Sequence, residues 1–160
     1  MRTLRLKDAF KNFFKRENGT QMIEFAIVFP VLLLLFAGTT ELGRLFYQYT
    51  TLAKGTRAAA RYLSTVQNVG TNTTNAKNIV LCGNAAGCGG TGQPAISLPN
   101  LTATNVVVTP PPATGVGVKY VTVEVTGYNY QFVVFDLNAL TGGTLNVALT
   151  PRTTMRYMVN

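Results

Sequence analysis

The sequence feature that most constrains the fold of this chain is an uninterrupted apolar run. Residues 25–40, with the sequence FAIVFPVLLLLFAGTT, contain no charged side chain, and extending the run back to residue 20 adds a single charge, Glu24. A helix of about 21 residues is roughly 30 Å long, which matches the hydrocarbon core of a bilayer. A helix from a soluble core would carry polar side chains every three or four positions, and this run has none after Glu24. We therefore expect residues 20–41 to form a membrane-spanning helix.

The charge of the chain is concentrated before this run. The net charge of the 160 residues is +8, and residues 1–19 supply half of it, with six basic and two acidic side chains. A basic flank beside an apolar segment is typical of the cytoplasmic side of a membrane protein. A basic N-terminus also occurs in nucleic-acid-binding proteins, but the adjacent apolar run makes that interpretation the poorer one and nucleic acid an unlikely partner.

Two residues of the run are unusual for a simple anchor. Pro30 removes a backbone donor inside the helix and predicts a kink or local melting, with a freed carbonyl that neighbouring helices must satisfy. Glu24 would cost several kcal/mol if it were isolated in lipid. Either Glu24 lies hydrated at the headgroup boundary, or another group supplies a cation to it. The residues alone leave both interpretations open.

A cleavable secretory signal peptide is the rival explanation of the N-terminal region. Such a signal needs small residues at −3 and −1 just after the apolar run, and residues 36–40 fit this requirement poorly. Helical periodicity also continues beyond the run without a break. We therefore expect the apolar segment to be retained in the mature chain.

The composition argues against an enzyme and against a metal site. The chain has no His, which removes the commonest general base and the commonest zinc ligand. Only four acidic residues follow residue 19, and no Ser or Cys stands beside a candidate base. We expect no catalytic residue, no metal and no cofactor.

Residues 19–25, with the sequence GTQMIEF, resemble the processing site of type IV pilin-like precursors. More closely, residues 22–64 resemble the TadE-like minor pseudopilins of the tight-adherence (Tad) pilus. The shared pattern is a Glu-Phe pair, an apolar stretch that contains Pro, a Glu-x-Gly-Arg motif and an Ala-rich end with Arg-Tyr. Its members here are Glu24-Phe25, Pro30, Glu41-Leu42-Gly43-Arg44 and Ala58-Ala59-Ala60-Arg61-Tyr62.

The resemblance implies processing and assembly. A prepilin peptidase of the bacterial inner membrane would cut after Gly19 and create a new α-amino group on Thr20. That amine, on a neighbouring subunit, would supply the cation for Glu24, and Phe25 and Pro30 would belong to the assembly helix. The implied partners are other pilin and pseudopilin subunits and the inner-membrane assembly platform. The chain would cross the membrane once, with its N-terminus cytoplasmic and its C-terminal domain periplasmic or extracellular, before incorporation into a surface pilus.

Beyond the apolar run the helix is predicted to continue to residue 66. Apolar and small side chains recur every three or four residues and predict a buried stripe: Leu42, Leu45, Phe46, Tyr49, Leu52, Ala53, Thr56, Ala60 and Leu63. Lys54, Arg57 and Arg61 lie on another face. This basic face is most simply a solvated surface, with anionic headgroups, surfaces or DNA as weaker functional options.

Residues 70–105 are polar and turn-rich, and we expect a loop there. This region holds both cysteines, Cys82 and Cys88, at a spacing that does not suit zinc. Because the compartment outside the cytoplasm is oxidising, we prefer a disulfide between them, with two free thiols as the alternative.

The C-terminal part carries strand signals. Alternating or apolar patterns predict strands at 106–108, 120–126, 130–135, 145–150 and 153–158. The expected fold class is α+β, in which one long helix packs on a small antiparallel sheet. We expect four regions: a removed basic leader (1–19), a transmembrane and assembly helix (20–41), an amphipathic helix (42–66) and an extracytoplasmic β-rich domain (67–160).

The function predicted for the chain is structural. The resemblance implies a pilin-like subunit, a minor pseudopilin, and we expect it to be trimmed by prepilin peptidase and used in a Tad-type pilus that supports surface adherence. The alternative is an unprocessed, single-pass, membrane-anchored module for binding or adhesion.

Overall fold

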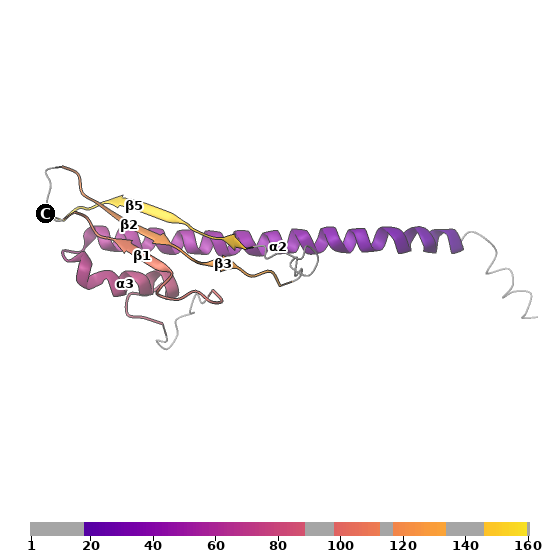
Figure 1. Ribbon diagram of the computed structural model, residues 1–160, viewed down its shortest axis with the longest axis horizontal. Helices are drawn as coiled ribbons and strands as arrows, with labels where there is room; N and C mark the ends of the chain where they lie inside the picture. The colour runs from indigo at the N-terminus through magenta and orange to yellow at the C-terminus, as the bar shows by residue number, and fades with distance from the viewer. Residues whose placement is uncertain (1–17, 89–97, 113–116, 134–145, 160) are drawn as a thin grey trace, which may run out of the picture.

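The computed structural model describes residues 18–88, 98–112, 117–133 and 146–159. It has the predicted α+β class, with one long helix that extends well beyond a small domain (Figure 1). The elements in chain order are α2 (Asn18–Thr65), α3 (Val69–Cys82), β1 (Val106–Thr109), β2 (Tyr120–Val125), β3 (Asn129–Tyr130), β4 (Val147–Ala148) and β5 (Arg152–Arg156). Residues 1–17 of the predicted leader lie outside the described residues.

Helix α2 is 48 residues long and confirms the helix predicted between residues 20 and 66. It runs through Pro30 without an interruption of helical structure, so the local melting considered for this position does not occur. Near the end of the apolar run, the hydroxyls of Thr39 and Thr40 donate to the carbonyls of Leu35 and Phe36, at 2.8 and 2.9 Å. These polar groups are therefore satisfied within the helix itself, as an apolar surrounding requires.

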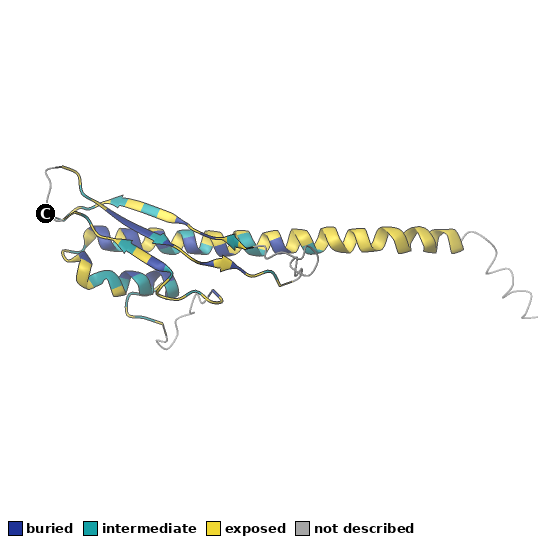
Figure 2. Cartoon of the chain, in the orientation of Figure 1, coloured by how far each residue is buried: buried dark blue, intermediate teal, exposed yellow. Residues whose placement is uncertain are grey.

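Burial divides α2 into two parts (Figure 2). The N-terminal part is exposed all round, whereas the part from residue 41 onward has one face buried against the rest of the domain. The fully buried positions of that face are Glu41, Gln48, Leu52, Thr56, Ala59, Ala60, Leu63 and Ser64.

The predicted apolar stripe is correct from Leu52 onward, and before it only Leu45 packs against the core. Leu42, Phe46 and Tyr49 are exposed, while Glu41 and Gln48 take the buried positions. The reason is the chemistry of the opposing residues, because two tyrosine hydroxyls meet α2 at this level and need polar partners.

Residues 70–105 were expected to form a loop, and the structure corrects this for the first third of the segment. Val69–Cys82 forms helix α3, which packs against α2 and ends at Gly83 in the left-handed conformation (φ 74°). Thr, Asn and Gly fill its first two turns and are weak helix formers, so local propensity does not predict it. Its burial supplies the missing stability, through Val69, Ala76, Ile79, Val80 and Cys82.

The main sheet is antiparallel, with strand order β1-β2-β5. Val121, Val123 and Val125 of the central strand are fully buried and β2 and β5 both pack on α2, which confirms the alternation predicted for 120–126. A second, two-stranded sheet pairs β3 with β4, which are shorter than the strands predicted at 130–135 and 145–150. Residues 134–145 lie outside the described parts of the chain.

Candidate functional site

The N-terminal part of α2, residues 19–40, is named the apolar half here. Its large apolar side chains from Met22 to Phe36 are between 44% and 75% exposed, and it extends away from the domain (Figures 1 and 2). It belongs to the one described helix that is long and apolar enough to cross a membrane. An apolar surface of this size on a soluble protein marks a membrane or protein contact.

Glu24 is the single charged residue of the apolar half. Among the described residues, no basic side chain lies within ion-pairing distance of its carboxylate. The first basic residue after it is Arg44, twenty positions later or about 30 Å along a helix. Any cation for Glu24 that follows it in the sequence is therefore out of reach within the same chain.

The other residues predicted for processing and assembly lie on the same half-helix. Gly19 and Thr20 are exposed in the first turn of α2, and a Cβ built on Gly19 would meet nothing within 4 Å. Phe25 stacks on Phe29, with ring centroids 5.3 Å apart, and Pro30 follows. The structure spaces these residues along the exposed half-helix and does not gather them into a pocket.

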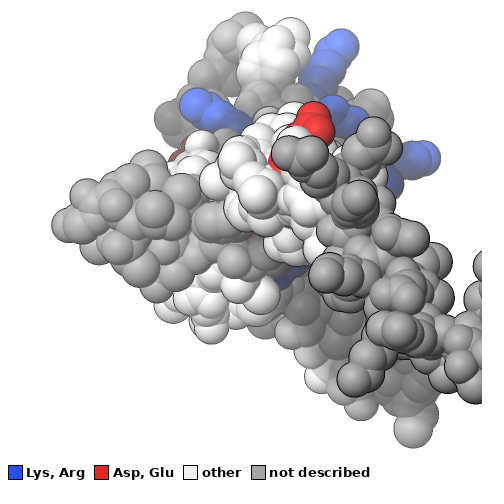
Figure 3. Space-filling model, turned by 90° about the vertical axis from the view of Figure 1, so that its right-hand side faces the viewer, with Lys and Arg blue, Asp and Glu red and all other residues white. Residues whose placement is uncertain are grey.

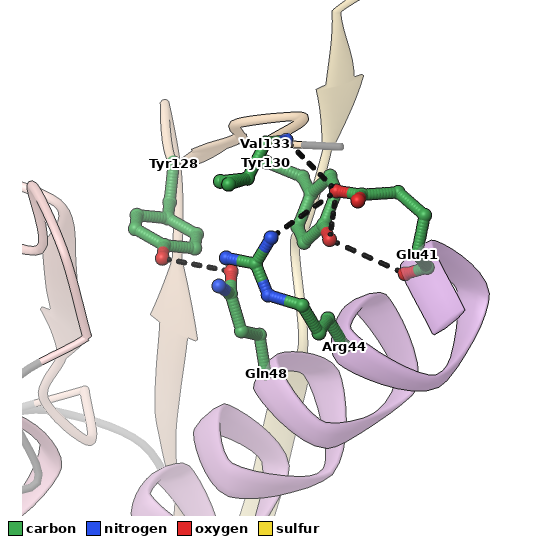
Figure 4. A network of polar contacts seen from close by, with 6 residues as sticks. All are labelled: Glu41, Arg44, Gln48, Tyr128, Tyr130 and Val133. Carbon is green, nitrogen blue, oxygen red and sulfur yellow. Dashed lines mark hydrogen bonds and ion pairs between the residues drawn. The ribbon is translucent and has the colours of Figure 1, made fainter. Parts of the chain in front are cut away.

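A partly buried polar network lies where the apolar half joins the domain (Figure 4). We call it the Glu41 cluster; its members are Glu41, Arg44, Gln48, Tyr128, Tyr130 and Val133. Glu41 is 5% exposed, and its Oε1 accepts hydrogen bonds from the Tyr130 hydroxyl (2.6 Å), the Val133 N–H (3.1 Å) and Arg44 Nη1 (3.4 Å). About two turns beyond Glu41 on α2, the Tyr128 hydroxyl donates to Gln48 Oε1 at 3.1 Å.

Both tyrosines of the cluster have a raised pKa. Burial, reinforced by the hydrogen bond to Glu41 and its negative charge, raises the pKa of Tyr130 to about 12. Burial also raises the pKa of Tyr128. Because the neutral hydroxyls remain donors at physiological pH, the segment 128–133 stays attached to α2 at the base of the apolar half. The cluster is a structural attachment of this segment to α2.

Sequence reasoning missed the role of this cluster. The Glu-x-Gly-Arg motif was noted only as part of a pattern. The available signal was spacing, because Glu41, Gln48 and Leu52 are separated by seven and four residues and so share one helix face. Polar residues in line with buried apolar ones indicate a buried polar contact.

The predicted basic face is present on the exposed side of α2. Lys54, Arg57 and Arg61 are all exposed, and no carboxylate of the described residues lies within ion-pairing distance of them. Viewed along the helix, most of the Lys and Arg side chains in sight project on one side of the domain (Figure 3). Arg57 and Arg61 line a surface hollow of about 580 Å³ that Lys54 does not reach.

The predicted disulfide between Cys82 and Cys88 is present, with the two Cα atoms 5.3 Å apart. It closes a short loop after α3, which a hydrogen bond from Asn78 Nδ2 to the Ala85 carbonyl also holds, at 3.2 Å. No group of three or more metal-ligating side chains occurs within the part of the chain that the structure describes.

The apolar half, the basic face and three members of the Glu41 cluster (Glu41, Arg44 and Gln48) lie on α2, and a match to a protein family falls on this helix. Residues 19–61 match the TadE-like protein family. The match confirms the resemblance predicted from the sequence, and it links this TadE-like segment to the Tad pilus and to a structural family of proteins. It begins at Gly19 and ends at Arg61, so it excludes α3 and the sheets. No curated protein and no solved structure matches the chain.

Proposed function

We propose that the chain is a pilin-like structural subunit, a minor pseudopilin, of a Tad-type pilus that supports surface adherence. In this proposal the apolar half crosses the bacterial inner membrane once, with residues 1–19 cytoplasmic and the domain periplasmic or extracellular. The observation that carries the proposal is the exposed apolar half of the TadE-like segment, which holds one acidic residue that no cation of the described residues pairs with. Lipid, and later the helices of neighbouring subunits, would cover this surface.

Processing supplies what Glu24 lacks. Prepilin peptidase would cut after Gly19, which removes the basic leader and leaves an α-amino group on Thr20. This amine can approach the Glu24 of its own chain only by fraying the first helical turn. A neighbouring subunit shifted by about one turn, or 5 Å along the helix, would present its amine without that distortion. Glu24 would then fix the register of helix packing, the role for which buried ionic pairs are best supported.

The size of the domain supports a minor role. Helix α3 and two small sheets lie beside the second part of α2, so each copy would occupy far more of a filament's outer surface than a bare helix would (Figure 1). We therefore assign the subunit to the initiation or the end of a filament, in contact with other pilin subunits and with the membrane assembly platform.

Replacing Glu24 with Gln tests the proposed function. The neutral side chain suits lipid at least as well, so we expect Glu24→Gln to insert in the membrane and to be trimmed after Gly19. We expect the trimmed variant to stay in the inner membrane and not to co-purify with pili or pilus subunits from the native host. Wild-type incorporation would show instead that Glu24 is only a hydrated residue at the membrane boundary.

The matched control for this experiment moves the charge by about one turn. The double variant Gln21→Glu/Glu24→Gln keeps one carboxylate in the same apolar surface, three residues nearer the N-terminus. If Glu24 sets a register, the double variant should also fail to assemble. Rescue of assembly by the shifted carboxylate would mean that any charge at the membrane boundary suffices.

A further inference from the structure

The domain carries more positive charge than its own acidic groups neutralise. After residue 41 the sequence has eight basic and two acidic residues. Arg152 pairs with Glu124 at 3.7 Å, and Lys77 donates to the Ala103 carbonyl at 3.1 Å. Arg57 and Arg61 have no such partner among the described residues, although they are neighbours one turn apart on α2.

These two arginines line the hollow between α2 and the edge of the main sheet. Its remaining lining residues are Ala58, Tyr62 and Thr65 of α2 and Met155 of β5. The hydroxyl of Tyr62 is already bonded to Asn72 Oδ1 at 2.9 Å, so the guanidinium groups are the charged donors that the hollow offers. An anionic ligand suits this surface.

Strand β5 forms one edge of the described sheet and borders the hollow through Met155. The N–H of Tyr157 and the carbonyl of Pro151 bond toward β2, to the Lys119 carbonyl and the Val125 N–H. Backbone N–H and carbonyl groups alternate in direction along a strand. The N–H and carbonyl groups of Arg152, Thr154 and Arg156 therefore point away from β2. Met158 follows the same alternation, and its N–H donates to the Ser64 carbonyl of α2 at 3.0 Å. The backbone groups of β5 that point away from β2 therefore lie on the side of the strand that is near α2.

We propose that this edge and hollow bind an extended acidic segment of a partner protein, which adds to the sheet beside β5 with a Glu-x-Glu or Asp-x-Asp spacing. The edge would supply main-chain hydrogen bonds, and Arg57 and Arg61 would bind alternate carboxylates. Two residues four positions apart on a helix are separated by about 6 Å along its axis. Two residues two positions apart on a strand are separated by about 6.6 Å, so the two spacings match.

Charge excludes a second copy of the chain as the occupant. Antiparallel pairing of β5 with itself would place Arg152 opposite Arg156, and like charges directly opposite each other are destabilising. A lipid headgroup is also a poor occupant. Arg57 lies sixteen residues beyond Glu41, or about 24 Å along the helix from the end of the apolar half. The exclusion of a lipid headgroup rests on the proposed membrane orientation. The arguments from the charge of the arginines and from the edge position of β5 in the described sheet do not.

The test measures binding to the full-length protein in detergent by fluorescence anisotropy. The probe is a labelled peptide of alternating Thr and Glu, compared with a Thr/Gln peptide and with one of identical composition whose Glu residues are adjacent. We expect the alternating acidic peptide to bind best. N-methylation of its backbone on the bonding side should abolish binding, which separates strand addition from simple charge attraction.

The variants Arg57→Gln and Arg61→Gln should each weaken binding about fivefold, the size of an exposed ion pair. Lys54→Gln is the matched control, because it removes the same charge from the same face outside the hollow, and we expect it to bind like wild type. All three positions are exposed, and circular dichroism checks that each variant folds.

Equal losses in all three variants, or unchanged binding of the N-methylated peptide, would overturn the proposal. So would tighter binding of single-stranded DNA or of phosphatidylglycerol vesicles than of the alternating peptide. Since binding is measured on purified protein, these outcomes do not depend on whether the chain is processed or assembled into a pilus.

Discussion

Gly19 is a residue that the folded chain itself does not require. A Cβ at position 19 would meet nothing within 4 Å, and the same is true of Gly38 in the apolar half. If glycine is needed at position 19, the need comes from a molecule outside the chain. A protease that holds its substrate as an extended backbone in a narrow cleft would impose such a need.

Valine substitutions at Gly19 and Gly38 test whether the protease requires glycine at position 19. Gly19→Val should insert in the membrane and accumulate as the uncut precursor, because the β-branched side chain blocks the peptidase. Gly38→Val, with equally open surroundings, should be trimmed like wild type. Immunoblotting of inner-membrane fractions measures both, and normal trimming of Gly19→Val would show that the cut does not depend on this glycine.

The raised pKa of Tyr130 predicts how the stability of the folded protein depends on pH. Its pKa is raised in the folded protein to about 12, above its ordinary value of 10.0. The contribution of Tyr130 is therefore complete below about pH 10 and is lost as the pH rises from there through about 12, because the unfolded chain ionises first. Near neutral pH, Tyr130→Phe should lower the free energy of unfolding by about 1–3 kcal/mol, since Glu41 loses the shortest of its described hydrogen bonds.

Urea unfolding of the detergent-solubilised protein measures both effects. Between neutral pH and about pH 11, wild type should lose more stability than Tyr130→Phe. Tyr47→Phe is the control, because Tyr47 is 68% exposed and should show the wild-type pH dependence. A wild-type pH dependence in Tyr130→Phe would contradict the account of the Glu41 cluster.

At the scale of elements, the contact between α2 and α3 depends on one glycine. A Cβ on Gly55 would lie 3.3 Å from both the Cα and the carbonyl oxygen of Val80. These are backbone atoms of the neighbouring helix, so the helices must separate to admit a larger side chain. Gly43, on the same helix, has nothing within 4 Å.

We therefore expect Gly55→Val to destabilise the domain by about 1–3 kcal/mol relative to Gly43→Val. Both variants replace helical Gly with the same residue, so the difference in helix propensity cancels and the contact with Val80 remains. Urea unfolding followed by far-ultraviolet circular dichroism measures the difference. Equal stabilities would mean that α3 adapts to the extra atoms without cost.

The elements also show what the sequence could predict. Helix α2 and strands β1, β2 and β5 were predicted because their apolar patterns are long or regular. Helix α3 was not, because its TNTTN stretch favours turns, and its helical structure depends on burial against α2. The side chains that meet across the Glu41 cluster are about 90 residues apart in sequence, so only the tertiary fold reveals their contact.

For the whole molecule, the account rests on one helix in two surroundings. Its first part has a bare apolar surface about as long as a bilayer is thick, and its second part is the core element of a basic domain. The Glu41 cluster lies at the boundary and fixes the domain to the helix there. This arrangement suits a subunit that is anchored by its apolar half until other helices replace the lipid.

The intact mass of the protein purified from its native host tests the central claim most directly. The account predicts a chain that has lost residues 1–19 and begins at Thr20, because only then does an amine become available to the Glu24 of a neighbouring subunit. A membrane-bound protein that retains those residues would contradict the account and would favour an unprocessed, membrane-anchored adhesion module.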